Sequence, residues 1–227
     1  MSNLILQTGR VEIDRDNRYK TRDLTHLGAY HNWVEQSFPE EIENNQRGRH
    51  LWRIDRLNGK DYLLVLSADR PKLEQLEQYG VEGTALTKSY DTWLDHIEAG
   101  MVLRFRLTAN PTHSIIEPNH PKGRVVPHVT IEQQKQWLAD RALRAGFELV
   151  ARADTAADET EKLAFDVVSH DWPTLHRRKG RSVRLSRVTF EGMLRVQDAD
   201  TFKQTLTKGL GREKAFGMGL MTVIPTE

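Results

Sequence analysis

The stretch GLGREKAFGMGL, residues 209–220, lies near the end of the chain and fixes the order of the elements beside it. A predicted helix over 198–208 precedes it, and a predicted strand over 219–224 follows it. Rossmann fingerprints and P-loops have the opposite order, strand before helix, so the pattern excludes both. Its glycines form two G-x-G pairs around a polar tripeptide: Gly209, Gly211, Gly217 and Gly219.

Two interpretations of this stretch stay open at the level of spacing. Glycine is favoured where the backbone needs positive φ or a close approach, so Gly209 is expected to end a helix and the rest to form a turn. Alternatively, the glycines expose backbone N–H groups to a phosphate chain, with Arg212 and Lys214 as phosphate ligands.

The preceding sequence predicts an α+β fold made of two similar halves. Strict alternation marks the strand at 101–109, where Arg104 and Arg106 lie on the face opposite the apolar side chains and are candidate RNA ligands. The first half predicts β-α-β-β-α-β from strands at 3–13, 50–55, 61–67 and 83–90 and helices at 23–37 and 71–79. The second half predicts the same order with insertions, from strands at 101–109, 147–152, 163–169, 182–196 and 219–224 and helices at 130–145 and 198–208.

Two tandem ferredoxin-like domains joined by a short linker follow from this repeat, with boundaries at 1–92 and 100–227. A single irregular α+β domain is the alternative. Asp23 is expected to cap the first long helix, and the proline-containing segment after Asn110 is expected to be a long polar loop.

Composition restricts the function classes. The chain has 227 residues, a net charge of +1 and no cysteine, which excludes disulfides and thiolate metal sites. It has no apolar run long enough to span a membrane and no basic, apolar start typical of a signal peptide, so we expect a cytoplasmic protein. No histidine pair or acidic cluster has metal-ligand spacing, so we expect no metal and no cofactor.

Positive charge is concentrated in residues 177–187, RRKGRSVRLSR, which hold six cations and no acid. A hairpin here would bind RNA through Arg177, Arg178, Lys179, Arg181 and Arg184. The same cations would also keep an exposed edge strand soluble, and both interpretations remain open.

His31 is the candidate for chemistry. On a helical wheel it falls within the apolar stripe of the first long helix, whereas His26 and Trp33 fall opposite. One interpretation is a hydrogen-bonded core histidine. The other is acid/base catalysis on RNA, whose 2′-hydroxyl is its own nucleophile, so that an imidazole suffices to move the proton.

Several stretches together resemble the CasE family, the CRISPR-RNA endoribonucleases of type I-E Cascade, in the RAMP superfamily. The matching stretches, in family order, are DL…YHNWVEQSFP (23–39), HLWRI (50–54), LRFRLTANP (103–111), QWLADRALRAGFEL (136–149), RVTFEGML (187–194) and GLGREKAFGMGLMTV (209–223). The resemblance implies two ferredoxin-like domains. It also implies metal-independent cleavage at the base of a repeat stem-loop, retention of the product RNA, and other Cascade subunits as partners.

The family's catalytic histidine lies seven residues before the Phe of a Phe-Pro pair, and His31 has this spacing to Phe38. The tyrosine that often lies three residues before it is Gly28 here. Tyr30 is close in sequence but points differently on the helix, so the second acid/base partner is unassigned. Some relatives mainly bind RNA, so a non-catalytic RNA-binding subunit is the alternative function.

Overall fold

The computed structural model describes residues 6–117, 120–152, 163–175 and 182–226. Its contacts divide the chain into two compact units. The first unit contains Met1–His96 together with two later segments, Thr174–Val183 and Glu213–Leu220. The second contains the rest. The two units separate near the predicted boundary at residues 92–100, but two later segments group with the first unit. The division into two domains at 1–92 and 100–227 therefore stays a prediction.

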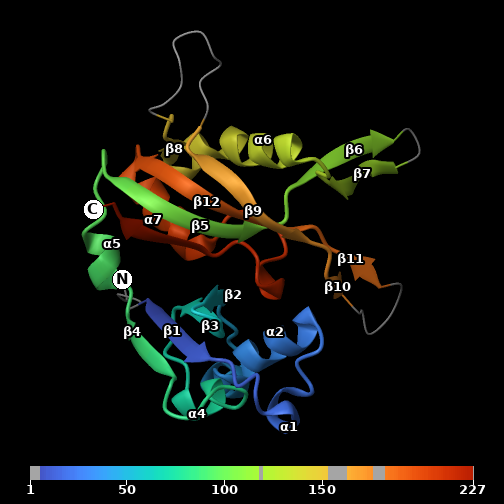
Figure 1. Ribbon diagram of the computed structural model, residues 1–227, viewed down its shortest axis with the longest axis vertical. Helices are drawn as coiled ribbons and strands as arrows, with labels where there is room; N and C mark the ends of the chain where they lie inside the picture. Colours follow the sequence, from blue (N-terminus) through green and yellow to red (C-terminus); the bar gives the residue numbers. More distant parts are fainter. Residues whose placement is uncertain (1–5, 118–119, 153–162, 176–181, 227) are drawn as a thin grey trace. The chain divides into compact units, whose positions relative to one another are not determined.

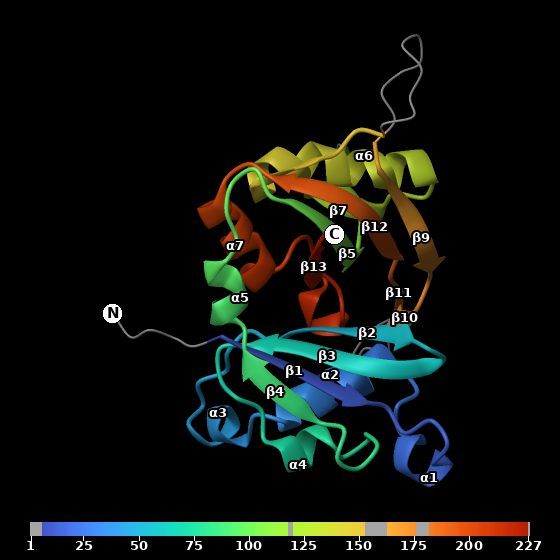
Figure 2. The same ribbon diagram turned by 60° about the vertical axis from the view of Figure 1, so that its left-hand side comes forward.

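The first unit is built on a four-stranded antiparallel sheet with the order β2-β3-β1-β4. This is the strand order of a ferredoxin-like fold, and the helices α2 and α4 lie on one face of the sheet (Figure 2). The β2-β3 turn has Asn58 and Gly59 at positive φ, as the sequence predicts. The strands are β1 (Gln7–Glu12), β2 (Leu51–Leu57), β3 (Lys60–Ser67) and β4 (Leu86–Ser89).

Short helices surround this sheet. The helix of the site, α2, starts later than predicted because the side chain of His26, not Asp23, accepts the N-terminal backbone N–H, from Ala29 at 3.3 Å. The connection predicted after the first unit's last strand contains a short helix. The helices are α1 (Arg18–Thr21), α2 (Leu27–Gln36), α3 (Pro39–Glu43), α4 (Leu73–Leu76) and α5 (Asp91–Asp95).

The second unit repeats the plan with the strand order β13-β5-β12-β8, and β9 also pairs with β12 (Figure 1). Thr130 forms a capping box with Gln133 at the start of α6, and Gly146 ends its last turn at positive φ. Its elements are β5 (Val102–Ala109), α6 (Ile131–Ala142), η1 (Leu143–Ala145), β8 (Phe147–Leu149), β9 (Phe165–Asp171), β12 (Arg187–Val196), α7 (Ala199–Lys208) and β13 (Met221–Pro225).

Aromatic side chains fill the core of this second unit. Trp137 of α6 stacks on Phe190 of β12 at a ring distance of 6.3 Å, and Phe202 of α7 packs edge-on against Phe147 of β8 at 5.7 Å. Both helices therefore bury their apolar faces on the sheet, as the 3.6-residue spacing of their sequences predicts.

The segment after Asn110 is wrongly predicted as a loop. Residues Thr112–Glu117 (β6) and His120–Pro127 (β7) form a separate two-stranded antiparallel sheet. Pro121 and Pro127 misled the prediction because they lie in β7 of this hairpin, outside both main sheets, where a missing N–H is tolerated, and Pro118 lies outside the described residues. The strand predicted at 182–196 is two strands, β11 (Val183–Arg184) and β12, interrupted at Leu185–Ser186, and β11 pairs with β10 (Thr174–Leu175).

The segment Glu213–Leu220, which contains the 3-10 turn η2 (Lys214–Phe216), packs on the edge strand β2 of the first unit. Trp52 donates its indole N–H to the Ala215 carbonyl at 3.0 Å, and Arg53 donates to the Leu220 carbonyl at 2.9 Å. Leu220 joins a buried cluster with Leu51 and Leu66. This packing covers β2 and places η2 beside α2.

Candidate active site

His31 lies on α2, and its side chain is 35% exposed. The ring contacts Phe216 of η2 edge-on, with 5.8 Å between ring centroids. The imidazole is therefore supported on one side by an aromatic ring and is open enough to meet a ligand. A fully buried core histidine, the other interpretation of the sequence, does not describe this position.

The wheel prediction is wrong for Trp33, which is fully buried although it was placed opposite the apolar stripe. Its ring packs edge-on against Tyr79, and its N–H donates to the Gln75 carbonyl at 3.2 Å. α2 therefore packs both against its sheet and against the α4 region, and a single-stripe wheel misses the second contact. His31 lies at the border of the buried surface.

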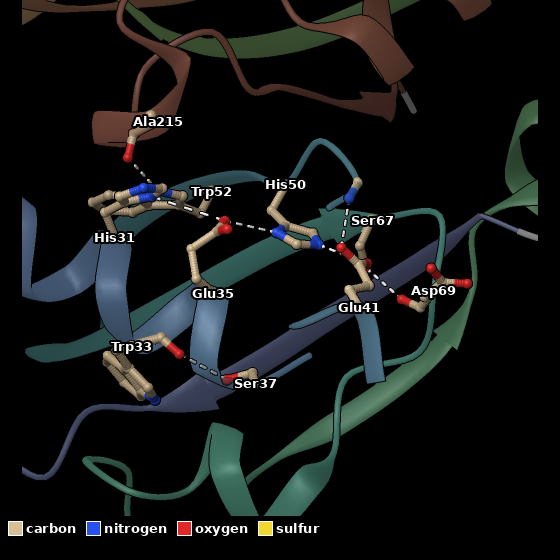
Figure 3. A network of polar contacts seen from close by, with 11 residues as sticks. His31, Trp33, Glu35, Ser37, Glu41, His50, Trp52, Ser67, Asp69 and Ala215 are labelled. Atoms are coloured by element: carbon tan, nitrogen blue, oxygen red, sulfur yellow. Dashed lines mark hydrogen bonds and ion pairs between the residues drawn. The ribbon is translucent and has the colours of Figure 1, made fainter. Parts of the chain in front are cut away.

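A polar network continues inward from His31 (Figure 3). Glu35, one turn further along α2, has its Oε1 3.9 Å from Nδ1 of His31 and 2.8 Å from Nδ1 of His50. The opposite nitrogen of His50, Nε2, lies 3.0 Å from Oε1 of Glu41 in α3. The chain of groups thus runs from the exposed imidazole to a buried carboxylate.

The surroundings of His31 favour its neutral form. Burial is the main cause that lowers the pKa of His31, and the positive charges of His50 and Arg47 lower it further, although Glu35 opposes them. An imidazole that is neutral near pH 7 is able to accept a proton, so the geometry suits a general base.

Cationic groups accompany His31 in the first unit. Lys214 is half-buried on η2, two residues before the Phe216 ring that contacts His31. Burial lowers the pKa of Lys214, and the nearby charge of Arg49 lowers it further. The turn that contacts His31 thus carries a cation, the kind of group that stabilises a negatively charged transition state.

Tyr30 lies on a different side of α2 from His31. It is 6% exposed and stacks on Trp52, with 6.1 Å between ring centroids, while the Arg15 guanidinium lies 6.0 Å from its ring. Gly28, at the position where the resemblance implies a tyrosine, lies against the His26 ring. Since Tyr30 is buried on another side of the helix, the first turn of α2 presents no tyrosine beside His31.

The glycines of the 209–220 stretch have packing roles. Gly209 is the C-cap of α7, and its N–H donates to the Thr205 carbonyl at 2.9 Å. A Cβ on Gly211 would lie 3.2 Å from the Trp137 ring, and one on Gly217 would lie 2.6 Å from the Trp52 ring. All four, Gly219 included, have positive φ. The cap-and-turn interpretation therefore describes their backbone, while Arg212 is exposed and remains a predicted RNA ligand.

The other predicted RNA ligands are spread over both units. Arg104 is exposed on β5, but Arg106 is paired with Glu191 at 2.6 Å. Arg184 lies over the Trp172 ring at 5.8 Å. Arg177, Arg178, Lys179 and Arg181 lie outside the described residues, and the paired strands β10 and β11 flank them.

Sequence reasoning missed Glu35, His50 and Glu41. The i,i+4 spacing of His31 and Glu35 is visible in the sequence and predicts that they share a helix face. His50 has no such signal, because only the fold brings the residue before β2 against α2. In the described parts of the chain, no group of three or more His, Cys, Asp or Glu side chains is arranged to hold a metal ion, and no helix is long and apolar enough to cross a membrane.

Comparison with known proteins places this site in a family context. A family model described as "CRISPR associated protein" matches residues 8–225. The chain is 29% identical to the CRISPR-associated endoribonuclease Cse3 of Thermus thermophilus, over 95% of this chain and 98% of that protein. It is 27% identical to the CRISPR system Cascade subunit CasE of Escherichia coli K12, over 57% of this chain and 61% of that protein.

Solved structures show the same fold. Thermus thermophilus Cse3, bound to an RNA representing a pre-cleavage complex, has a TM-score of 0.78 at 24% identity, covering 97% of this chain and 100% of the other. Cas6e of Escherichia coli K-12 has a TM-score of 0.57 at 21% identity, covering 98% and 100%. The α+β architecture with two ferredoxin-like units is thereby confirmed.

Proposed function

Because the chain belongs to the CRISPR associated protein family, as the resemblance to CasE predicted, we propose that it is an endoribonuclease that cleaves CRISPR precursor RNA at the base of the repeat stem-loop. The observation that carries this proposal is His31, a half-exposed imidazole with a lowered pKa beside the cation-bearing turn η2. The relatives of the chain, Cse3 and CasE, support CRISPR RNA as the substrate class.

The chemistry starts with the RNA itself. Neutral His31 removes the proton of the 2′-hydroxyl, whose oxygen attacks the adjacent phosphorus. The P–O bond to the 5′ oxygen breaks, leaving a 2′,3′-cyclic phosphate and a 5′-hydroxyl. The reaction uses a nucleophile already in the substrate, so it needs no metal-activated water.

Lys214 is the cation that we assign to the negative charge on the phosphorane. Its lowered pKa also suits it to release a proton to the departing 5′ oxygen, so that the proton gained by His31 is balanced by the proton lost from Lys214. The protein would retain the product RNA, act with other Cascade subunits, and work in the cytoplasm, where the transcript is made.

A second candidate function is a non-catalytic RNA-hairpin-binding subunit of the same complex. The observation that favours it is the first turn of α2, where Gly28 replaces the family's tyrosine and Tyr30 is buried against Trp52. This function requires the same fold and the same cations but no acid/base group at His31.

Single-turnover cleavage of a labelled repeat hairpin in EDTA separates the two functions. Wild-type protein is expected to cleave, and His31→Ala is expected to lose at least about a hundredfold in rate while binding normally. His26→Ala, which changes the N-cap of the same helix, is the matched control and should keep its activity after correction for folding. Binding without cleavage by the wild type would establish the second function, and equal cleavage by His31→Ala would remove His31 from the mechanism.

A further inference from the structure

His50 is almost completely buried between α2, α3 and the start of the first sheet. Its side chain is 2% exposed, and its ring stacks on Phe38 with 3.9 Å between centroids and 7° between planes. Each ring nitrogen faces a carboxylate oxygen: Glu35 at 2.8 Å and Glu41 at 3.0 Å. The ring therefore has one orientation and no freedom to rotate.

Two carboxylates on opposite nitrogens define the protonation of His50. A neutral imidazole has one N–H and satisfies one acceptor, whereas the imidazolium has two and satisfies both. Both contacts are made, and both raise the pKa of His50 against the opposing effect of burial. The geometry and the raised pKa therefore favour the imidazolium form of His50 between its two carboxylate partners, which is the condition under which a buried charge is stable.

Glu35 connects this buried cation to the surface. Its Oε1 is shared between His50, at hydrogen-bond distance, and His31, at 3.9 Å from Nδ1. A separation of 3.9 Å is too long for a hydrogen bond, but contacts of catalytic groups often shorten when substrate binds. The contact of this carboxylate with Nδ1 of His31 is marked in Figure 3.

We propose that Glu35 and His50 are positioning residues for His31. His50 fixes the Glu35 carboxylate, and Glu35 accepts the Nδ1–H of His31, so that the unprotonated Nε2 faces the RNA 2′-hydroxyl. A carboxylate that selects the tautomer of a catalytic imidazole performs this task in other enzymes. The inference rests on the proposed role of His31 and names two residues that this role needs.

The charges around His31 give the two positioning residues opposite effects. Glu35 faces it from α2, His50 from the residue before β2 and Arg47 from the preceding loop. The turn η2 places the uncharged Phe216 ring against it and carries the cation Lys214 two residues earlier. Glu35 raises the pKa of His31, whereas His50 and Arg47 lower it. Behind them, Glu41 faces His50, and Asp69 in turn faces Glu41. The Glu35 carboxylate can therefore orient His31, while His50 offsets the rise in the pKa of His31 that this carboxylate causes.

An NMR titration of the histidines in the full-length, RNA-free protein tests this arrangement. The pKa of His31 is expected to fall in Glu35→Gln and to rise in His50→Gln, with the Nδ1–H tautomer dominant in the wild type. Glu43→Gln removes an exposed carboxylate from the neighbouring helix α3 and is the matched control, with no shift expected. Shifts in the same direction for both variants, or no shift, would overturn the proposal.

Kinetics supply the second readout. Glu35→Gln is expected to lower the single-turnover cleavage rate at least about tenfold, with unchanged affinity for a hairpin carrying a 2′-deoxynucleotide at the cut. Its pH–rate profile should move its acidic limb to lower pH, and Glu35→Asp should recover part of the rate. A rate equal to wild type would refute the positioning role.

Folding and function are separable in this design. If circular dichroism shows that His50→Gln does not fold, Glu41→Gln replaces it. Loss of Glu41 lowers the pKa of His50 and so the fraction of His50 that is charged, which should also raise the pKa of His31. Absence of cleavage by the wild-type protein would overturn the proposed function, and normal cleavage by His31→Ala would remove His31 from its mechanism. Unshifted His31 titration beside an inactive His31→Ala would overturn the positioning pair alone.

Discussion

At the residue scale, the buried network of His50, Glu35 and Glu41 has consequences for stability. His50 lies between two carboxylates, and breaking such a pair by removing one partner leaves an uncompensated charge in the interior. The network is therefore expected to contribute to folding as well as to His31, and its contribution depends on pH because its members titrate.

Removing His50 tests that contribution. The pKa of His50 is raised in the folded protein, so its stabilisation is fully present below about pH 6.5 and is lost as the pH rises through the folded value. The lowered pKa of Glu35 makes its stabilisation present above about pH 4.5, and this is lost on acidification. The window for both is therefore roughly pH 4.5 to 6.5.

We expect His50→Gln to lower the free energy of unfolding by about 3 kcal/mol at pH 6 and by less at pH 9. Urea unfolding followed by tryptophan fluorescence measures both values. Glu43→Gln, exposed on α3, is the control and should change little at either pH. A destabilisation by His50→Gln that is equal at pH 6 and pH 9 would contradict a charged His50.

At the element scale, the turn η2 depends on glycines that let it approach β2. Gly217 has φ of +76°, and a Cβ there would lie 2.6 Å from Cζ3 of the buried Trp52. Gly59, in the β2-β3 turn, has φ of +80° and open space around its Cα. The two positions share a backbone conformation and differ in their surroundings.

Alanine at each position separates strain from close packing. Gly59→Ala should cost about 1–2 kcal/mol, the penalty of a left-handed backbone, and should leave cleavage unchanged. Gly217→Ala has the same backbone penalty, and its methyl group must also displace Trp52 or η2. We therefore expect a larger loss of stability and a lower cleavage rate. Thermal unfolding and single-turnover assays measure the two effects. Equal losses would show that η2 tolerates the added methyl.

At the scale of the whole molecule, charge distribution matters more than the net charge of +1. Six cations lie in residues 177–187, and polyanion affinity follows the number of phosphates that cations neutralise. This segment therefore remains the predicted determinant of RNA affinity, separate from the groups that perform the chemistry.

Salt titration of hairpin binding tests the segment. Arg177→Ala/Arg178→Ala should weaken binding and reduce the slope of log affinity against log salt by about 2, roughly one per lost phosphate contact. Arg18→Ala/Arg22→Ala removes the same charge from exposed positions on and after α1 and is the control. A slope that falls equally in both pairs would mean that general charge, and not this segment, sets the affinity.

The sequence alone determined the repeated β-α-β-β-α-β order, the alternation of β5, the end of α7 at Gly209, and the candidate His31. These features depend on residues close together in the chain, where periodicity and capping act. The β6-β7 hairpin was missed because prolines at the margin of a fold do not prevent strand pairing.

Only the tertiary structure decided what surrounds His31. Trp33 is buried because α2 packs on two sides, and His50 meets Glu35 because the sheet brings the start of β2 against α2. The stretch 209–220 was expected to bind phosphate or to form a cap and turn; its second half packs on β2 and sets Phe216 against His31. These contacts join residues some 15 to 185 positions apart, and no local pattern encodes which distant surfaces will meet.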